Sequence, residues 1–320
     1  MELSKNNIMV SVCMTTYNHE KFIKQSIESV LNQKTTFDYE IILSNDASTD
    51  NTSNLILEIL NSHPRSQIVK YYNQSINIGM HKNGEFVLKQ CKGKYIAICE
   101  GDDFWVDPYK LETQVNYLEL NSDCGLVHHD VNYYFEKNQI LIYDYKKSKN
   151  IQTPNGKVTD FLILNNFINT LSVVFRKDLL IDFFNIPTDI RNQFLMTDYF
   201  MWLLFSTKFN FYYIPKTMAT YRILESSASN SKIYDEKIKF LESYCDIKLY
   251  FIEYTTISKQ KIEEYRNQEA SIISIKNLEF KKSMKYSNKL KLHNIRNISI
   301  FLLSRIFYYL KFTRIIIKFL

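Results

Sequence analysis

Short apolar runs alternate with amphipathic stretches along the N-terminal third of the chain. Four runs rich in β-branched and aromatic residues have the length and composition of buried strands: Ile8–Met14, Tyr39–Ser44, Ile68–Tyr72 and Lys94–Cys99. Apolar residues recur at helical spacing between these runs, for example over Phe22–Leu31 and Thr52–Leu60. Strands that alternate with helices in this way predict an α/β fold with a doubly wound, mainly parallel sheet flanked by helices.

The alternation continues less regularly to about residue 225. Asp107 and Pro108 predict the start of a helix that runs to about Leu120. The further predicted elements are a strand at Gly125–Val131, a hairpin at Tyr133–Tyr145, a helix at Val158–Asn165, a strand at Leu171–Phe175, a helix at Asp198–Ser206 and strand material at Asn210–Tyr221. No linker rich in Gly, Pro or Ser divides these elements, so we expect one domain over residues 1–225.

Beyond residue 225 the chain becomes polar and Lys-rich at helical spacing. This pattern predicts a helical extension over residues 226–294, with helices at about 231–254 and 258–289. Residues 1–225 carry 22 Lys and Arg against 25 Asp and Glu, whereas residues 226–320 carry 18 against 9. The basic excess therefore belongs to the extension, where it favours an anionic partner.

The last segment, residues 295–320, combines long apolar residues with basic ones. No acidic residue follows Glu279. Arg305, Lys311, Arg314 and Lys318 interrupt the apolar stretches, which leaves no run of about 18 residues as a membrane-spanning helix needs. The last three fall on one helical face, which predicts a basic amphipathic helix lying on an anionic membrane surface. Packing of this helix on the protein's own core or on a partner is the alternative.

Cysteine usage and the first residues bear on the cellular compartment. The five cysteines form no CxxC pair, and four lie in or beside apolar runs, so we expect reduced, structural thiols. Neither a basic leader nor an apolar core of about seven residues precedes the first strand. We expect a catalytic part in the cytoplasm or at the cytoplasmic face of a membrane.

An acidic turn, Glu100-Gly101-Asp102-Asp103, follows the predicted strand Lys94–Cys99 directly. Open α/β sheets bind ligands at this end of their strands. Carboxylates this close repel one another unless a cation lies among them, and oxygen ligands suit Mg²⁺ or Mn²⁺. The alternative is a solvated loop that only caps the next helix. Polar turns also follow the first three strands, at residues 15–18, 45–50 and 77–79, so we expect one nucleotide-sized cleft floored by the acidic turn.

Residues 9–130 resemble the nucleotide-binding half of the family 2 inverting glycosyltransferases, which have the GT-A fold. The matching segments are VSVCMTTYNHEKFIKQSIESVLNQ, EIILSNDASTDNT, NIGMHKNG and GKYIAICEGDDFW, followed by the helix DPYKLETQVNYL. The resemblance implies that Thr16 and Asn18 border the nucleotide, that Asp46 hydrogen-bonds the base and that Asp50 closes its loop. It also places Lys82 where the family often has a basic residue facing the nucleotide.

The acidic turn resembles the family's metal and ribose motif. Asp102 is then the first choice as ligand of a bound Mg²⁺ or Mn²⁺, with Glu100 and Asp103 beside it. The chain has Glu100 where the family more often has Asp, so direct coordination by its longer side chain or contact through water are both open. Trp105, just after the turn, is the aromatic residue that we assign to the sugar side.

Residues 165–230 resemble the second half of the family more weakly. Thr170 lies in a segment like the acceptor-side loop, and Asp198 stands at the start of an apolar helix, where the family has its general base. An N-cap role for Asp198 is the alternative. Arg222 lies in a segment that resembles a late loop folding over the diphosphate, and it is the cation expected there.

The resemblance implies an inverting glycosyltransferase. Its expected substrates are a nucleotide-diphosphate sugar and a glycan or lipid-linked hydroxyl acceptor, in the assembly of a surface polysaccharide or glycolipid. A sugar nucleotidyltransferase is disfavoured, because residues 8–20 lack its glycine-rich basic loop. A catalytically inactive homologue is the other alternative, suggested by Glu100 and Thr197 at positions where Asp and an acid are commoner. Nucleic acid is not expected as a partner, since the basic residues alternate with long aliphatic ones.

Overall fold

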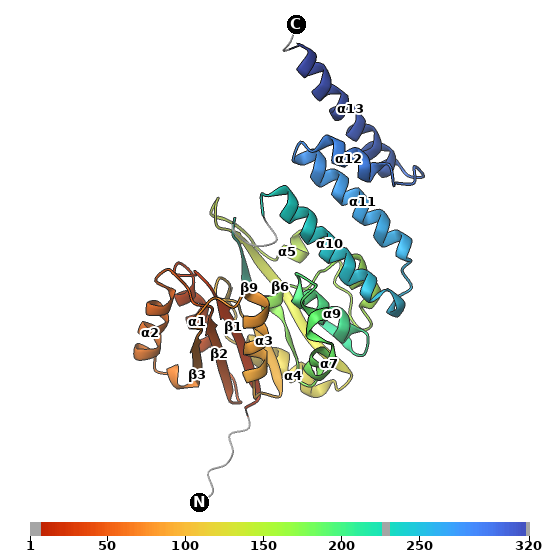
Figure 1. Cartoon of the computed structure of the whole chain (residues 1–320). Helices are drawn as coiled ribbons and strands as arrows, with labels where there is room; N and C mark the ends of the chain where they lie inside the picture. The colour runs from red at the N-terminus through yellow and green to blue at the C-terminus, as the bar shows by residue number, and fades with distance from the viewer. Residues whose placement is uncertain (1–7, 226–230, 318–320) are drawn as a thin grey trace, which may run out of the picture. The chain divides into compact units, whose positions relative to one another are not determined.

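The computed structural model describes residues 8–225 and 231–317, with side chains in the last helix described up to residue 310. The chain forms two compact units (Figure 1). The first comprises the residues up to Asn192 together with Thr197–Leu224. The second comprises Gln193–Met196 and the chain from Glu225 onward.

The first unit is built on a nine-stranded sheet with the order β3-β2-β1-β4-β8-β6-β9-β5, and β7 pairs with β6 outside this path. Its first half is parallel, as the sequence predicts. It contains β1 (Val10–Thr16), β2 (Tyr39–Asn45), β3 (Val69–Asn73) and β4 (Tyr95–Ile98). The helices between them are α1 (Ile23–Leu31), α2 (Thr52–Ser62) and α3 (Met80–Gln90). The predicted alternation is confirmed.

The second half of the sheet is mixed. It contains β5 (Phe104–Trp105), β6 (Cys124–Phe135), β7 (Ile140–Ile142), β8 (Val174–Arg176) and β9 (Asn210–Ile223). Strand β8 is antiparallel to both of its neighbours, β4 and β6, whereas β6 and β9 are parallel. Strand β5 pairs with β9, so the segment after the acidic turn is tied to the strand that carries Arg222.

Helices surround this half of the sheet. They are α4 (Lys110–Leu120), α5 (Tyr145–Ser148), α6 (Thr159–Leu164), α7 (Leu179–Asn185), α8 (Thr188–Arg191) and α9 (Thr197–Ser206). Helix α4 begins at Lys110, two residues later than predicted from Pro108, and Asp107 accepts the N–H of Tyr109 at 2.8 Å. All five cysteines are free and buried, as expected.

The second unit is helical. It contains α10 (Tyr234–Tyr250), α11 (Lys259–Lys276), α12 (Phe280–Ser287) and α13 (Ile295–Ile317). The sequence predicted a single helix over 258–289, which is wrong. The chain breaks at Leu278, whose φ of 62° is left-handed, and Glu279 N–H donates back to the carbonyl of Ser274 at 2.8 Å. The break lets α12 fold back onto α11.

Helix α13 packs on α11 and α12 through small polar residues. Ser304 is fully buried, and its hydroxyl lies 3.1 Å from that of Ser271 and 2.7 Å from that of Ser283. Asn297 is also buried and accepts a hydrogen bond from Gln268 at 2.6 Å. The inward side of α13 is therefore partly polar. Across the described ranges 8–225 and 231–317, we find no helix with the length and apolarity needed to cross a bilayer.

Candidate active site

The turns after the parallel strands meet at one edge of the sheet. Backbone hydrogen bonds join them: Asp46 N–H donates to the Thr16 carbonyl at 2.9 Å, and Gly101 N–H donates to the Thr15 carbonyl at 2.9 Å. The turns after β1, β2 and β4 are thus tied into one structure. The predicted convergence of these loops is present.

Asp46 fixes the third turn to the other two. Its two carboxylate oxygens accept the N–H groups of Ile78 and Gly79 at 2.8 and 2.9 Å. Gly79 has a φ of 87°, a conformation that side-chain-bearing residues rarely adopt, and it precedes the first residue of α3. The carboxylate of Asp46 is 2% exposed, so its first task is to hold this turn.

Asn18 and Asp50 organise the loop after β2. Asn18 has a left-handed φ of 56°, its N–H donates to the Ser48 hydroxyl at 2.9 Å, and its Oδ1 accepts the N–H of Thr49 at 2.8 Å. Asp50 accepts the N–H groups of Glu20 and Thr52 at 3.1 and 3.0 Å. Both residues therefore connect the loop after β1 to the loop after β2, in keeping with the loop-closing task expected of Asp50.

Gly101 lies directly against Thr16. A Cβ atom at position 101 would lie 2.6 Å from Thr16 Oγ1 and 2.9 Å from His19 Nδ1, closer than real Cβ contacts. Thr16 is 2% exposed, and its hydroxyl lies 3.2 Å from His19 Nδ1. The acidic turn can approach β1 this closely only because residue 101 has no side chain.

The acidic turn and Asp198 share one electrostatic environment. Burial raises the pKa of Glu100 to about 8, and the carboxylates of Asp102 and Asp198 add to this shift. Burial also raises the pKa of Asp103 well above its ordinary value, helped by Asp102 and Glu100. Asp103 Oδ2 is buried and has no hydrogen-bond partner within the described part of the chain. Asp198, from a distant part of the sequence, thus lies close enough to Glu100 to raise the pKa of that carboxyl further.

Arg222 is fixed against the acidic turn from β9. Its N–H donates to Asp103 Oδ1 at 2.8 Å, and its guanidinium donates to the Asp102 carbonyl and to Gln25 Oε1. The guanidinium also lies over the ring of Phe104 at 4.6 Å. Arg222 is 6% exposed, and burial lowers its pKa from the ordinary value. Arg222, the positively charged residue expected near the diphosphate, therefore lies at the acidic turn.

Asp198 and Thr170 are in direct contact. The Thr170 hydroxyl donates to Asp198 Oδ2 at 2.8 Å. Next to them, the hydroxyl of Thr197 lies 2.5 Å from Nδ1 of His81. Burial lowers the pKa of His81, although the nearby charge of Asp198 acts in the opposite direction. Asp198, the expected base, and Thr170, the expected acceptor-side residue, are therefore neighbours in the structure.

Trp105 is buried in the core, whereas Lys82 lies on helix α3. Trp105 is 4% exposed, its indole N–H donates to the Leu171 carbonyl at 3.1 Å, and Lys110 Nζ lies 4.1 Å from its ring centre. This ring is part of the core and presents no face on which a sugar could stack, which argues against the sugar-side role expected of Trp105. Lys82 lies on α3, and no acid of the described ranges pairs with it.

Three site residues were not predicted from the sequence. His19 lies among charged groups of the cleft: burial lowers its pKa, while the charges of Asp102 and Asp50 act to raise it. His81 contacts Thr197, as described above. Burial and the acids Asp103 and Glu100 raise the pKa of Tyr221. The histidines carry a weak sequence signal, since both lie inside the loop segments that match the family.

The acidic turn has the donor chemistry for a divalent cation. Within residues 8–225 and 231–317, no group of three or more His, Cys, Asp or Glu side chains is arranged to hold a metal ion alone. Mg²⁺ usually takes one or two carboxylates and completes its shell with water and substrate phosphates. Glu100 and Asp102 are mutually repelling carboxylates, and Asp103 has a buried oxygen without a partner. These residues fit a cation that shares its ligands with a diphosphate.

Comparison with known proteins identifies the class and then the family. The fold is that of GT-A glycosyltransferases: the mannosyltransferase PcManGT from Pyrobaculum calidifontis, in complex with GDP-Man and Mn²⁺, aligns with a TM-score of 0.60 at 12% identity, over 95% of this chain and 86% of that one. S. aureus TarS 1-349 in complex with UDP-GlcNAc aligns with a TM-score of 0.56 at 16% identity, over 93% and 79%. The sequence profile of Glycosyl transferase family 2 matches residues 11–180, and the chain belongs to this family.

Curated relatives extend the match beyond the profile. An uncharacterized protein of Mycobacterium tuberculosis is 31% identical over 237 residues, which is 73% of this chain and 64% of the relative's length. The Escherichia coli protein WfgD, a UDP-Glc:alpha-D-GlcNAc-diphosphoundecaprenol beta-1,3-glucosyltransferase, is 27% identical over 82% of this chain and 98% of its own length. The chain thus spans less than two thirds of the mycobacterial relative and nearly all of WfgD.

Proposed function

We propose that this protein is a metal-dependent, inverting glycosyltransferase that moves a sugar from a nucleotide-diphosphate donor to a hydroxyl acceptor. One observation carries the proposal: burial raises the pKa of Glu100 to about 8, and the charges of both Asp102 and Asp198 add to this shift, so Asp198 lies close to the acidic turn. A candidate base for an acceptor hydroxyl and candidate ligands for a diphosphate-bound cation therefore belong to one site. Membership in glycosyl transferase family 2 supports the same reaction class.

On the donor side, the chain would bind the nucleotide between the turns after β1, β2 and β3. Thr16, Asn18, Asp46 and Asp50 hold these turns in one arrangement, and Lys82 on α3 is a cation without an acidic partner among the described residues. We assign Asp102 and Glu100 as candidate holders of Mg²⁺ or Mn²⁺. The bound ion would neutralise charge on the diphosphate leaving group.

On the acceptor side, Asp198 would take the proton of the attacking hydroxyl. Thr170 donates to one carboxylate oxygen, Oδ2, and so orients the carboxylate. A single base is sufficient for inversion, because attack from the face opposite the leaving group needs no covalent intermediate. Arg222, held at the turn by Asp103 and Gln25, would add positive charge beside the departing diphosphate.

A matched pair of variants tests this function. Donor hydrolysis is measured as release of UDP or GDP from a panel of sugar nucleotides with Mn²⁺. We expect Asp198→Asn to abolish transfer and hydrolysis while nucleotide binding by calorimetry stays intact. Asp178→Asn, an exposed acid at the start of α7, is the control and should keep full activity. Nucleotide binding without turnover in the unmodified protein would instead support the inactive homologue.

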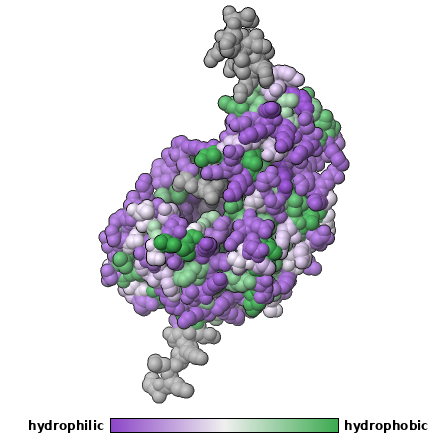
Figure 2. All heavy atoms as spheres, viewed as in Figure 1, coloured by the Kyte–Doolittle hydropathy of each residue, from purple (hydrophilic) through white to green (hydrophobic). Residues whose placement is uncertain are grey.

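We also propose that the second unit holds the protein on an anionic membrane. On α13, three apolar residues lie opposite the buried Asn297 and Ser304 and are open to solvent, with Ile295 84%, Leu302 50% and Ile306 51% exposed. Figure 2 shows apolar residues among the hydrophilic ones at the surface of this unit. A helix that buries polar groups and exposes aliphatic ones is suited to insertion among lipid head groups.

Charge supports the same partner. Ten Lys or Arg and no acidic residue follow Glu279, so an anionic bilayer would be favoured over a neutral one. The basic face predicted from the sequence rests on Lys311, Arg314 and Lys318, which lie outside the described side chains. The proposed domain organisation is therefore a transferase domain in residues 1–225, a helical extension in 226–294 and a membrane-associating helix in 295–320.

The biological setting is proposed on the same grounds. Relatives include WfgD, whose name gives a diphosphoundecaprenol-linked acceptor, and a putative teichuronic acid biosynthesis glycosyltransferase of Bacillus subtilis. We therefore propose assembly of a surface polysaccharide or glycolipid on a glycan or lipid-linked acceptor. Five free, buried thiols favour a reducing compartment, which agrees with the cytoplasmic face of the membrane.

A further inference from the structure

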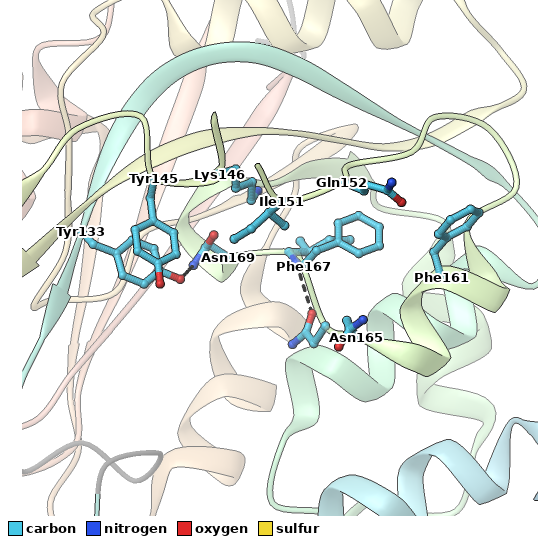
Figure 3. A pocket seen from close by; sticks show the side chains of 11 residues that line it. Tyr133, Tyr145, Lys146, Ile151, Gln152, Phe161, Asn165, Phe167 and Asn169 are labelled. Carbon is cyan, nitrogen blue, oxygen red and sulfur yellow. Dashed lines mark hydrogen bonds between the residues drawn. The ribbon is translucent and has the colours of Figure 1, made fainter. Parts of the chain in front are cut away.

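A cavity of about 500 Å³ opens in the first unit beside the loop that carries Thr170. Its walls come from β6, from α5 and the segment after it, and from α6 and the segment after it, and the lining residues lie outside residues 9–130, which the sequence linked to the nucleotide. In Figure 3 the stacked Tyr133 and Tyr145 stand at one end and Phe161 at the other, with Ile151 and Phe167 between them. The volume suits a small organic ligand.

The lining combines amide groups with aromatic and aliphatic side chains. Gln152, Asn165, Asn166 and Asn169 supply the amides, and the described lining contains no carboxylate. Amides both donate and accept hydrogen bonds, as sugar hydroxyls do. Amides beside apolar faces therefore match a sugar ring, which carries hydroxyls at its edge and C–H groups on its faces.

The stacked tyrosines supply a flat platform. The rings of Tyr133 and Tyr145 lie 3.6 Å apart with an angle of 6° between their planes. Tyr133 also makes an edge contact with the ring of Tyr221, 5.3 Å away at an angle of 66°, whereas no second ring of the described residues pairs with Tyr145. Tyr145 is half-buried and lines the cavity, so part of its ring can meet the C–H groups of a ligand there.

Lys146 is the only cation in the described lining, and it is turned into the protein. It is 3% exposed, its Nζ donates to the His129 carbonyl at 3.1 Å, and it lies 3.4 Å from His128 Nδ1. Burial lowers its pKa to about 7, against the opposing charge of Asp130. An amine already occupied in this way favours a neutral ligand over a phosphate or a uronate.

Neighbouring residues of one loop contact the cavity and the proposed base. Asn169 Nδ2 donates to the hydroxyl of Tyr133 at 2.9 Å, and the next residue, Thr170, donates to Asp198 Oδ2 at 2.8 Å. The cavity wall at Asn169 is therefore one residue along the chain from the side chain that contacts Asp198. We propose that the cavity binds an uncharged sugar residue of the acceptor and directs one of its hydroxyls to Asp198, an inference that rests on the proposed function.

Saturation-transfer NMR of the full chain with UDP or GDP and Mg²⁺, which is diamagnetic, tests this inference. The probes are neutral methyl glycosides of glucose, galactose, mannose and N-acetylglucosamine, compared with methyl glucuronide. We expect transfer to at least one neutral glycoside and at least tenfold weaker binding of the glucuronide. Tyr145→Ala and Gln152→Ala should each weaken the neutral probe about tenfold. Asn116→Ala, an exposed amide on α4, should have no effect.

The outcomes separate this inference from the proposed function. Nucleotide binding is measured by calorimetry on the same samples. Intact nucleotide binding with no neutral glycoside bound, with the glucuronide preferred, or with Tyr145→Ala and Gln152→Ala both without effect, would overturn the cavity assignment alone. If the unmodified protein bound no nucleotide, the proposed function would be overturned. Binding of a neutral glycoside in that case would still show that the cavity takes a sugar.

Discussion

The hydroxyl of Thr170 donates a 2.8 Å hydrogen bond to Oδ2 of Asp198. The two residues are 28 positions apart in sequence, one in the turn before β8 and the other in the first turn of α9. This bond leaves the second carboxylate oxygen, Oδ1, for a substrate proton. The pair therefore defines where an acceptor hydroxyl would have to lie.

Removal of the Thr170 hydroxyl should slow turnover without weakening donor binding. Thr170→Val keeps the shape of the side chain but leaves Asp198 free to rotate, and a hydrogen bond to a charged group is worth about 1.5–3 kcal/mol. We expect kcat to fall at least about tenfold, with the KM for the sugar nucleotide unchanged. Thr170→Ser, which retains the hydroxyl, should recover most of the rate. Equal rates for the Val and Ser variants would show that the bond has no part in turnover.

Cation binding should strengthen as the pH rises towards 8. Burial, with Asp102 and Asp198 nearby, raises the pKa of Glu100 from 4.5 to about 8, so this carboxyl is protonated at neutral pH and a bound cation must displace its proton. Below pH 8 the Mn²⁺ affinity, measured by calorimetry in the presence of UDP or GDP, should fall up to about tenfold per pH unit. Glu100→Gln should abolish this contribution, and an unchanged pH profile in that variant would contradict the assignment.

The same shift has a consequence for stability. A carboxyl whose pKa is higher in the folded state than in the unfolded state stabilises the fold below pH 4.5, and this contribution is lost as the pH rises to about 8. The cation-free protein should therefore lose unfolding free energy over this range relative to Glu100→Gln. Thermal unfolding of both proteins across the pH range, with chelator present, measures the difference. The same dependence of the unfolding temperature on pH in both proteins would contradict the prediction.

Gly101 should tolerate no side chain. In Gly101→Ala the new Cβ would lie 2.6 Å from Thr16 Oγ1, and relief of such overpacking costs about 1–3 kcal/mol. We expect a lower unfolding free energy and weaker nucleotide binding. Gly84→Ala is the matched control, because Gly84 lies inside α3 with nothing within 4 Å of the added atom. That variant should be stabilised by about 0.5–1 kcal/mol, and a similar loss in both variants would contradict the account.

The exposed side of α13 should determine membrane binding. Replacing Leu302, Ile306 and Leu310 together by Gln removes apolar groups that are 50%, 51% and 53% exposed, and leaves the buried Ser304 in place. We expect at least about tenfold weaker sedimentation with anionic vesicles. The control replaces Leu57, Leu120 and Ile181 by Gln, which are 47%, 84% and 63% exposed in the first unit. Equal vesicle binding by both triple variants would exclude α13 as the contact.

The sequence predicts those features that depend on local pattern. The β-branched runs before Thr16, Asn45 and Cys99 predict the parallel strands, and the polar turns behind them predict the meeting of Asp46 with the loop after β1. The helical spacing of residues 258–289 could not show that Leu278 takes a left-handed φ, because few residues with a side chain do so. The single long helix predicted there was therefore wrong.

Other features depend on tertiary contacts that no local pattern contains. Trp105 follows the acidic turn in sequence, but its pairing with β9 turns the indole into the core. His81 reaches Thr197 across 116 positions, and its neighbours along the chain give no sign of this contact. The antiparallel position of β8 between β4 and β6 likewise could not be predicted from local sequence, because it depends on the pairing of distant strands.

The central claim is that the acidic turn and Asp198 form one metal-dependent nucleotide site. Calorimetry of UDP and GDP, each with and without Mn²⁺, tests it most directly in the unmodified protein and in Asp102→Ala. The account predicts nucleoside diphosphate binding that requires Mn²⁺ and is lost in Asp102→Ala. Binding that is independent of Mn²⁺ and equal in the two proteins would contradict it.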